Sequence, residues 1–296
     1  MTEQFVHANG VKLAYEEFGS SKDPAIILIM GLATQMIAWP ESFCEGLANE
    51  GFRVVRFDNR DNGLSDKFHH ARPPNIPLAL LRARMGLPLS VPYTLRDMAD
   101  DTLGLLDALS IEQAHVVGVS MGGMIGQLVT ALYPQRVQSF TSIMSSSGDR
   151  KLPAASAKVS AAMLRRPRLG EQAYIEHRLK VSELIGSPAF RPHPEELKEK
   201  ILRSFRRSYY PEGALRQMAA IVESGSRVKL LQSICRPTLV IHGKHDLLVP
   251  VEAGIDTARH ISGARLKLFD GMGHDLPAPL LPRFTSLISE HASAAQ

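Results

Sequence analysis

Short apolar runs alternate with helical patterns along most of this chain. Residues 25–30 form a continuous apolar run, as expected of a strand that is covered on both faces of its sheet. Five more segments are predicted as strands, at residues 53–57, 114–117, 137–144, 237–241 and 266–269. Because helical patterns separate them, the order predicts a mostly parallel sheet with helices on both faces.

The chain begins with a predicted hairpin. Residues 5–8 and 11–15 flank the pair Asn9-Gly10. Asn-Gly is the strongest short signal for a two-residue hairpin turn. These two strands bring the expected sheet to eight strands.

Helices are predicted between most of the strands. Three of them cover residues 40–50, 251–260 and about 280–291. Another opens at Thr94, which forms a capping-box pattern with Asp97. The long Pro-containing stretch from residue 59 to about residue 93 carries no predicted element.

The pattern changes after the sixth strand. Strand signals are nearly absent over residues 147–233, where helical runs are predicted at 154–164, 172–184 and 195–207. We expect a helical cap over 147–233, inserted into a core formed by residues 1–146 and 234–296.

Composition and the two cysteines narrow the class of protein. The chain has 296 residues, of which 44% are hydrophobic and 22% charged, as in a globular protein. No apolar run reaches the roughly 20 residues that cross a bilayer, and residues 1–5 do not resemble a secretory leader. Cys44 and Cys235 cannot form a disulfide framework and are expected to be buried. A cytoplasmic location is therefore expected.

Charge is distributed unevenly along the chain. Residues 150–236 hold 18 Lys and Arg against 8 Glu and no Asp, whereas the rest of the chain is acidic overall. A solvated helical surface explains this segment, and attraction to anionic lipid or an acidic substrate is the alternative. The segment has no recognised nucleic-acid motif, so we expect no nucleic-acid partner.

A Gly-x-Ser-x-Gly motif carries the strongest chemical signal. Gly118, Ser120 and Gly122 stand between a predicted strand and a predicted helix. This is the pattern of a nucleophile elbow, in which a sharp turn exposes a serine hydroxyl. The turn needs small neighbours, which the glycines supply. A Gly-rich turn of a nucleotide-binding protein is the alternative, but the chain lacks a phosphate-loop lysine.

Four segments together give the chain a family resemblance. They are the elbow at 118–122, the loop Asp58-Asn59-Arg60-Asp61-Asn62-Gly63-Leu64-Ser65, the segment His242-Gly243-Lys244-His245-Asp246 and the segment Gly271-Met272-Gly273-His274. With them the chain resembles the α/β-hydrolase fold superfamily of serine hydrolases over essentially its whole length. It is most similar to the aclacinomycin methylesterase-like and carboxylesterase group, in which an Asp also stands where most relatives have Gly, here Asp61.

The resemblance implies a nucleophile, an acid and a base in that chain order. Ser120 would be the nucleophile. Asp246 follows the strand after the cap, and His274 follows the next strand, so they would be the acid and the base. The base removes the serine proton, and the acid orients the base.

Other side chains compete for these roles. Asp149 is an alternative acid, because some relatives place the acid after the preceding strand. His242 and His245 could be metal ligands, but with no second ligand cluster they are expected to brace the loop of Asp246. His260, Asp256 and Asp270 are interpreted as solvated or structural residues. We expect neither a metal nor a cofactor.

The oxyanion of an acyl-transfer intermediate needs hydrogen-bond donors. The backbone N–H of Met121 follows from the elbow. By resemblance, the second donor is the N–H of Leu32, in the loop that begins at Met30. Relatives usually carry His where this chain has Met30, but Gly31 is retained.

We therefore expect a serine esterase that cleaves apolar small-molecule or methyl esters. The Leu-rich segment 78–89 would cover the site, or would simply pack beneath a long loop. Cofactor-free haloperoxidase or perhydrolase activity and carbon–carbon bond hydrolysis use the same three residues and remain alternatives. A ligand receptor on the same fold is the non-enzymatic alternative. The protein would be a monomer or a homodimer.

Overall fold

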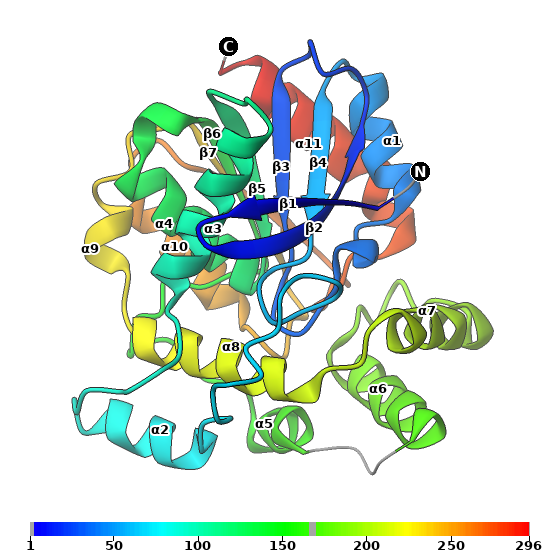
Figure 1. Ribbon diagram of the computed structural model, residues 1–296, viewed down its shortest axis with the longest axis vertical. Helices are drawn as coiled ribbons and strands as arrows, with labels where there is room; N and C mark the ends of the chain where they lie inside the picture. The colour runs from blue at the N-terminus through cyan, green and yellow to red at the C-terminus, as the bar shows by residue number, and fades with distance from the viewer. Residues whose placement is uncertain (1–2, 166–169, 296) are drawn as a thin grey trace.

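The computed structural model describes residues 3–165 and 170–295 and contains one eight-stranded sheet (Figure 1). Its strands are β1 (Gln4–Ala8), β2 (Val11–Phe18), β3 (Ala25–Ile29), β4 (Arg53–Phe57), β5 (Ala114–Val119), β6 (Val137–Ile143), β7 (Thr238–Gly243) and β8 (Arg265–Phe269). They lie in the order β1-β2-β4-β3-β5-β6-β7-β8. The pairs β1/β2 and β2/β4 are antiparallel and all others are parallel, so the predicted sheet is confirmed.

Helices cover both faces of this sheet (Figure 1). One face carries α1 (Glu41–Asn49) and α11 (Leu281–Ser293), which pack against each other. The other carries α3 (Leu95–Ala108), α4 (Met121–Leu132) and α10 (Val251–His260). A hydrophobic core lies on each face, and Val116 and Ile125 belong to one while Leu28 and Phe284 belong to the other. Burial of these apolar side chains stabilises the layers.

The remaining helices lie between β6 and β7, with one exception. They are α5 (Ala157–Leu164), α6 (Glu171–Ile185), α7 (Pro194–Arg207), α8 (Pro211–Ser224) and α9 (Val228–Leu231), and the exception is α2 (Ile76–Arg84). Short 3₁₀ turns occur at Met36–Ala38, Pro134–Arg136 and Ala278–Leu280. Figure 1 shows α2, α5, α6, α7 and α8 gathered at one end of the sheet. None of the helices within the described ranges has the length and apolarity that a membrane span requires.

Two local predictions are confirmed. The β1–β2 turn places Asn9 and Gly10 at φ 48° and 75°, the left-handed conformation of a two-residue hairpin. Thr94 caps α3 by accepting a hydrogen bond from the Asp97 N–H, while the Asp97 carboxylate accepts one from the Thr94 N–H. The turn of the hairpin and the N-terminus of α3 are thus fixed by the residues that predicted them.

Two expectations were wrong. The stretch 59–93 does contain a helix, α2, whose N-terminus is capped by the Asn75 side chain. Cys235 is exposed, whereas Cys44 is buried as expected. Cys235 lies in the turn between α9 and β7, where the chain leaves the helical layer before it enters the sheet.

Candidate functional site

Ser120 sits in the sharp turn between β5 and α4. Its φ is 55° and its ψ is −118°, a conformation that non-glycine residues rarely adopt. A Cβ on Gly118 would lie 2.2 Å from the Gly122 carbonyl oxygen, and a Cβ on Gly122 would lie 2.0 Å from the Ile29 carbonyl oxygen. The two glycines are therefore required by the close approach of the backbone, and Ser120 remains partly exposed.

A continuous chain of hydrogen bonds runs from Ser120 to His274 and Asp246. His274 Nδ1 lies 2.6 Å from Asp246 Oδ2, and His274 Nε2 lies 3.0 Å from Ser120 Oγ. Since an ionised carboxylate can only accept, Nδ1 carries the proton and donates it. In the neutral imidazole Nε2 is then the acceptor for the Ser120 hydroxyl. The three side chains come from the loops after β5, β7 and β8, whose carboxyl ends share one edge of the sheet.

The loop around Asp246 stabilises its ionised form. Burial raises the pKa of Asp246, but the charge of His274 and hydrogen bonds from His242, His274 and the Val249 backbone outweigh burial and lower the pKa to about 2. The N–H groups of Leu248 and Val249 donate to Asp246 Oδ1 at 2.9 and 2.8 Å. Asp246 is thus an anion at neutral pH, aimed at the His274 Nδ1–H.

The competing residues have other partners. Asp149 accepts a hydrogen bond from the Lys151 N–H, whereas the carboxylate on His274 is that of Asp246. His242 Nε2 lies 2.9 Å from the Val249 carbonyl oxygen and His245 Nδ1 accepts from the Gly271 N–H, so both histidines contact the loops of Asp246 and His274.

The remaining competitors lie away from this arrangement. Asp256 Oδ1 lies 3.2 Å from His260 Nδ1 on α10, and Asp270 is largely exposed beside His245. Within residues 3–165 and 170–295, no three His, Cys, Asp or Glu side chains are grouped so that they could hold a metal ion.

The loop after β3 approaches the elbow closely. A Cβ on Gly31 would lie 3.2 Å from Ser120 Cβ. The Met30 side chain is buried in the core, and its carbonyl oxygen accepts a hydrogen bond from Asn59 Nδ2 at 2.9 Å. The backbone of Leu32 and the N-terminus of α4 at Met121 therefore lie on the same side of the structure as Ser120.

Gln217 of α8 holds this loop in place. Its Oε1 accepts a hydrogen bond from the Ala33 N–H at 2.9 Å, and its Nε2 donates to the Arg60 carbonyl oxygen at 2.8 Å. Gln217 is fully buried, and Ala33 has a φ of 53°. One amide thus connects α8 to both the loop after β3 and the loop after β4.

Arg216, the neighbour of Gln217, forms a buried ion pair with Asp61. Arg216 Nε and Nη2 lie 2.7 and 3.0 Å from the two carboxylate oxygens. The Tyr93 hydroxyl and the Phe68 N–H also donate to this carboxylate. Asp61 has a φ of 66°, which explains why glycine is usual at this position in the family it resembles. In this chain the Asp61 carboxylate pairs with Arg216 on α8, although a positive φ is unfavourable for a residue other than glycine.

The loop of His274 is held by the residues that end α6. The His274 N–H donates to the Ile185 carbonyl oxygen at 2.7 Å. Asp275 accepts hydrogen bonds from both the backbone N–H and the hydroxyl of Ser187, and the Ser187 Oγ accepts from the Gly273 N–H. The helices between β6 and β7 therefore position the base loop as well as the loop after β3.

Sequence reasoning missed these positioning residues. Arg216, Gln217, Ser187 and Ile185 lie in a segment where the sequence shows only helical periodicity. The one available signal was Asp61, because an Asp in place of the expected Gly needs a cationic or donor partner once it is buried. The sequence does not indicate which of the many arginines between β6 and β7 is the partner of Asp61.

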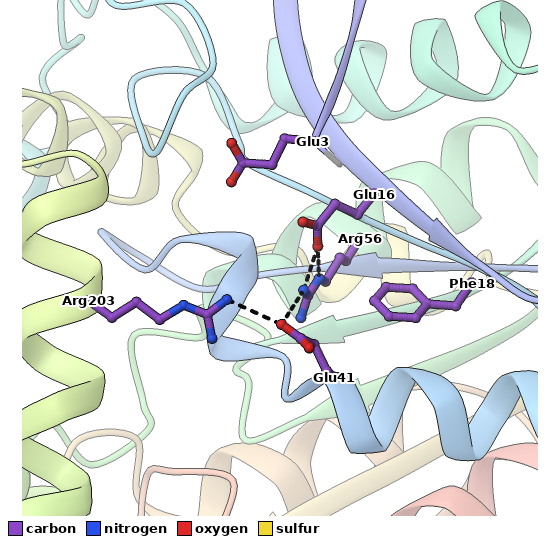
Figure 2. A pocket seen from close by; sticks show the side chains of 6 residues that line it. All are labelled: Glu3, Glu16, Phe18, Glu41, Arg56 and Arg203. Carbon is purple, nitrogen blue, oxygen red and sulfur yellow. Dashed lines mark hydrogen bonds and ion pairs between the residues drawn. The ribbon is translucent and has the colours of Figure 1, made fainter. Parts of the chain in front are cut away.

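A separate charged cavity of about 320 Å³ has a lining that does not include Ser120. Figure 2 shows the side chains that line it. Its lining residues are Glu3, Glu16, Phe18, Glu41, Arg56 and Arg203. Arg56 Nε donates to Glu16 at 2.7 Å and Arg203 pairs with Glu41 at 3.2 Å. Glu3 pairs with Arg207 at 2.6 Å. Every charged side chain of this cavity thus has a partner within the chain.

Comparison with known proteins identifies a matching family and relatives of this chain. The family model described as alpha/beta hydrolase fold matches residues 24–277. Rhodomycin D methylesterase of Streptomyces sp. (strain C5) is 26% identical over all of this chain and 99% of its own length. 2-Hydroxymuconate semialdehyde hydrolase of Pseudomonas sp. is 29% identical over 70% of this chain and 72% of its own length.

The fold also matches solved structures. The meta-cleavage product hydrolase of Pseudomonas fluorescens superimposes with a TM-score of 0.79 at 21% identity, covering 99% of this chain and 98% of the other. At that identity the match establishes the fold and nothing finer.

Proposed function

We propose that this chain, which belongs to the alpha/beta hydrolase fold family, is a serine esterase that cleaves carboxylic esters through an acyl-serine intermediate. One observation carries the proposal. Asp246, His274 and Ser120 form a continuous hydrogen-bond chain, with the serine at a strained, partly exposed turn. Such a chain activates a hydroxyl that is otherwise a weak nucleophile at neutral pH.

The proposed reaction has two halves. Ser120 Oγ attacks the ester carbonyl carbon while His274 Nε2 takes its proton, and Asp246 stabilises the imidazolium that forms. The Nε2 proton then passes to the leaving alkoxide, the carbon–oxygen bond breaks and alcohol departs. Water, deprotonated by His274, attacks the acyl-serine, and the Ser120 oxygen leaves with the proton. The products are a carboxylic acid and an alcohol, with no cofactor.

We assign the oxyanion to two backbone donors, the N–H groups of Leu32 and Met121. The close approach of Gly31 to Ser120 supports this assignment. Because both donors belong to the backbone, replacement of the usual His by Met30 removes no donor. Hydrogen bonds to the developing negative charge would lower the barrier.

We also assign residues 147–233 to a cap and residues 1–146 with 234–296 to the core. The cap segment contacts both loops that flank Ser120, through Gln217 of α8 and through Ser187, which follows α6. The substrate class we infer is a small methyl or apolar ester. The similarity to rhodomycin D methylesterase along the whole chain supports a methyl ester.

Carbon–carbon bond hydrolysis is the second candidate. It is favoured by the similarity to 2-hydroxymuconate semialdehyde hydrolase, whose named substrate contains no ester. Both reactions would use Ser120, His274 and Asp246, so only the substrate distinguishes them.

Substrate profiling tests the proposal. We expect methyl and short-chain aryl esters to yield acid and alcohol in equal amounts, measured by chromatography of both products. The control is 2-hydroxymuconate semialdehyde at the same concentration. Turnover of that compound with no turnover of any ester would contradict the proposal, as would formation of peracid from a carboxylate and peroxide in place of ester cleavage.

Gln217→Ala is expected to lower kcat about tenfold or more while KM changes little. The substitution frees the Ala33 N–H and the backbone that presents Leu32, so it weakens a contact made mainly in the transition state. Steady-state kinetics with an aryl ester would measure the split. Gln217→Glu is a second variant, which keeps the acceptor for the Ala33 N–H but turns the donor to the Arg60 carbonyl oxygen into an acceptor, so its activity relative to alanine separates the two contacts. A change confined to KM would contradict a positioning role.

A further inference from the structure

Helix α2 presents an unburied apolar face. Leu78, Leu81 and Met85 are 52%, 55% and 65% exposed, and together with Arg82 they follow the i, i+3, i+4, i+7 spacing of one helix face. Leu87, just beyond the end of the helix, is also exposed. We call these five residues the outer face of α2. The sequence analysis expected this segment either to cover the site or to pack beneath a long loop, and the exposure of these side chains does not fit packing beneath a loop.

The opposite side of α2 fixes the helix on the protein. Ile76 and Ala79 are buried, and α2 packs against α8 (Figure 1). Since α8 carries Gln217 and Arg216, which bind the loops beside Ser120, the outer face of α2 lies at the same end of the molecule as Ser120. The outer face thus belongs to a helix whose opposite side is already packed against the protein.

Basic side chains predominate beside this face. Arg82 and Arg84 lie on α2 itself and are exposed, and residues 67–96 contain no acidic residue. Arg150 Nη2 donates to the Ala83 carbonyl oxygen at 2.9 Å, which brings the segment 149–151 to α2. In this segment Arg150 and Lys151 are exposed and Asp149 is half-buried. Apolar side chains on a helix flanked by arginine and lysine are the pattern of an interfacial helix.

We propose that the outer face of α2 docks the protein onto the surface of an anionic phospholipid bilayer. The apolar side chains enter the headgroup boundary, and Arg84 and Lys151 pair with lipid phosphates. Charge selects this occupant. Two copies of the chain meeting through this face would bring like charges together, and a nucleic acid would leave the leucines and Met85 without apolar contact. An anionic bilayer satisfies both the charge and the apolar surface.

Vesicle sedimentation tests this inference. Vesicles of phosphatidylglycerol and phosphatidylcholine should sediment the protein, whereas pure phosphatidylcholine vesicles should not, and about 0.5 M salt should release it. Arg84→Gln with Lys151→Gln should weaken partitioning about thirtyfold, because each cation near the surface contributes about 1 kcal/mol. Leu81→Ser with Met85→Ser should weaken it at least about tenfold.

A matched control removes two cations elsewhere. Arg259→Gln with Arg283→Gln lowers the net charge equally at exposed positions on α10 and α11 and should leave partitioning within about threefold of the parent protein. All variants should hydrolyse a water-soluble ester at the parent rate, which separates this inference from the proposed function. The inference would be overturned by an equal loss of vesicle partitioning in the control pair or by equal binding to neutral vesicles. It would also be overturned if the protein bound no vesicles and instead formed a dimer that dissociates in Leu81→Ser with Met85→Ser.

Discussion

Ser120→Ala is expected to lower kcat for an aryl ester by about 10⁵- to 10⁶-fold. The substitution removes the oxygen that would attack the carbonyl carbon, and no other hydroxyl accepts a hydrogen bond from, or donates one to, His274 within the described residues. Removal of the nucleophile in a comparable serine hydrolase site has an effect of this size. Stopped-assay kinetics over several hours would measure the residual rate.

The variant should remain folded, because alanine tolerates the space around Ser120 and the flanking glycines are retained. Circular dichroism and the thermal midpoint serve as its control. Activity within tenfold of the parent protein would remove Ser120 from the chemistry.

Arg216→Met is expected to lower the free energy of unfolding by about 3–5 kcal/mol. The substitution leaves the Asp61 carboxylate buried with only the Tyr93 hydroxyl and the Phe68 N–H as donors, and an uncompensated buried charge is costly. Urea unfolding followed by circular dichroism would measure the change. Because Arg216 is adjacent to Gln217, kcat should fall as well.

The double variant Asp61→Gly with Arg216→Met is the matched control. It removes both charges and places glycine at a φ of 66°, where glycine is favoured. Its stability should therefore exceed that of Arg216→Met alone and lie within about 1–2 kcal/mol of the parent protein. If the free energy of unfolding falls equally in both variants, the ion pair between Asp61 and Arg216 does not anchor α8.

The sheet could be predicted because its signals are local. Short runs rich in apolar residues identify the strands, and Asn9-Gly10 identifies the hairpin. The elbow could be predicted for a steric reason, since no side chain fits at Gly118 or Gly122. The roles of Ser120, His274 and Asp246 stay a prediction, but the structure brings the three side chains into one hydrogen-bond chain.

The contacts that hold the site could not be predicted, because they join residues distant in the chain. Gln217 binds Ala33 across 184 positions, and Arg216 binds Asp61 across 155, and nothing local marks either partner. Helix α2 was missed for a different reason. It has only nine residues and contains Pro77 in its first turn, so its short apolar run resembles a loop until Asn75 is seen to cap it.

The central claim is that Ser120 forms a covalent bond with the acyl group. The most direct measurement is treatment with a fluorophosphonate, followed by intact mass and peptide mapping. We predict one phosphonyl group per chain, attached to the peptide that contains Ser120, no label in Ser120→Ala, and loss of ester hydrolysis in proportion to labelling. A label on another residue, or full activity after complete labelling of Ser120, would contradict the account.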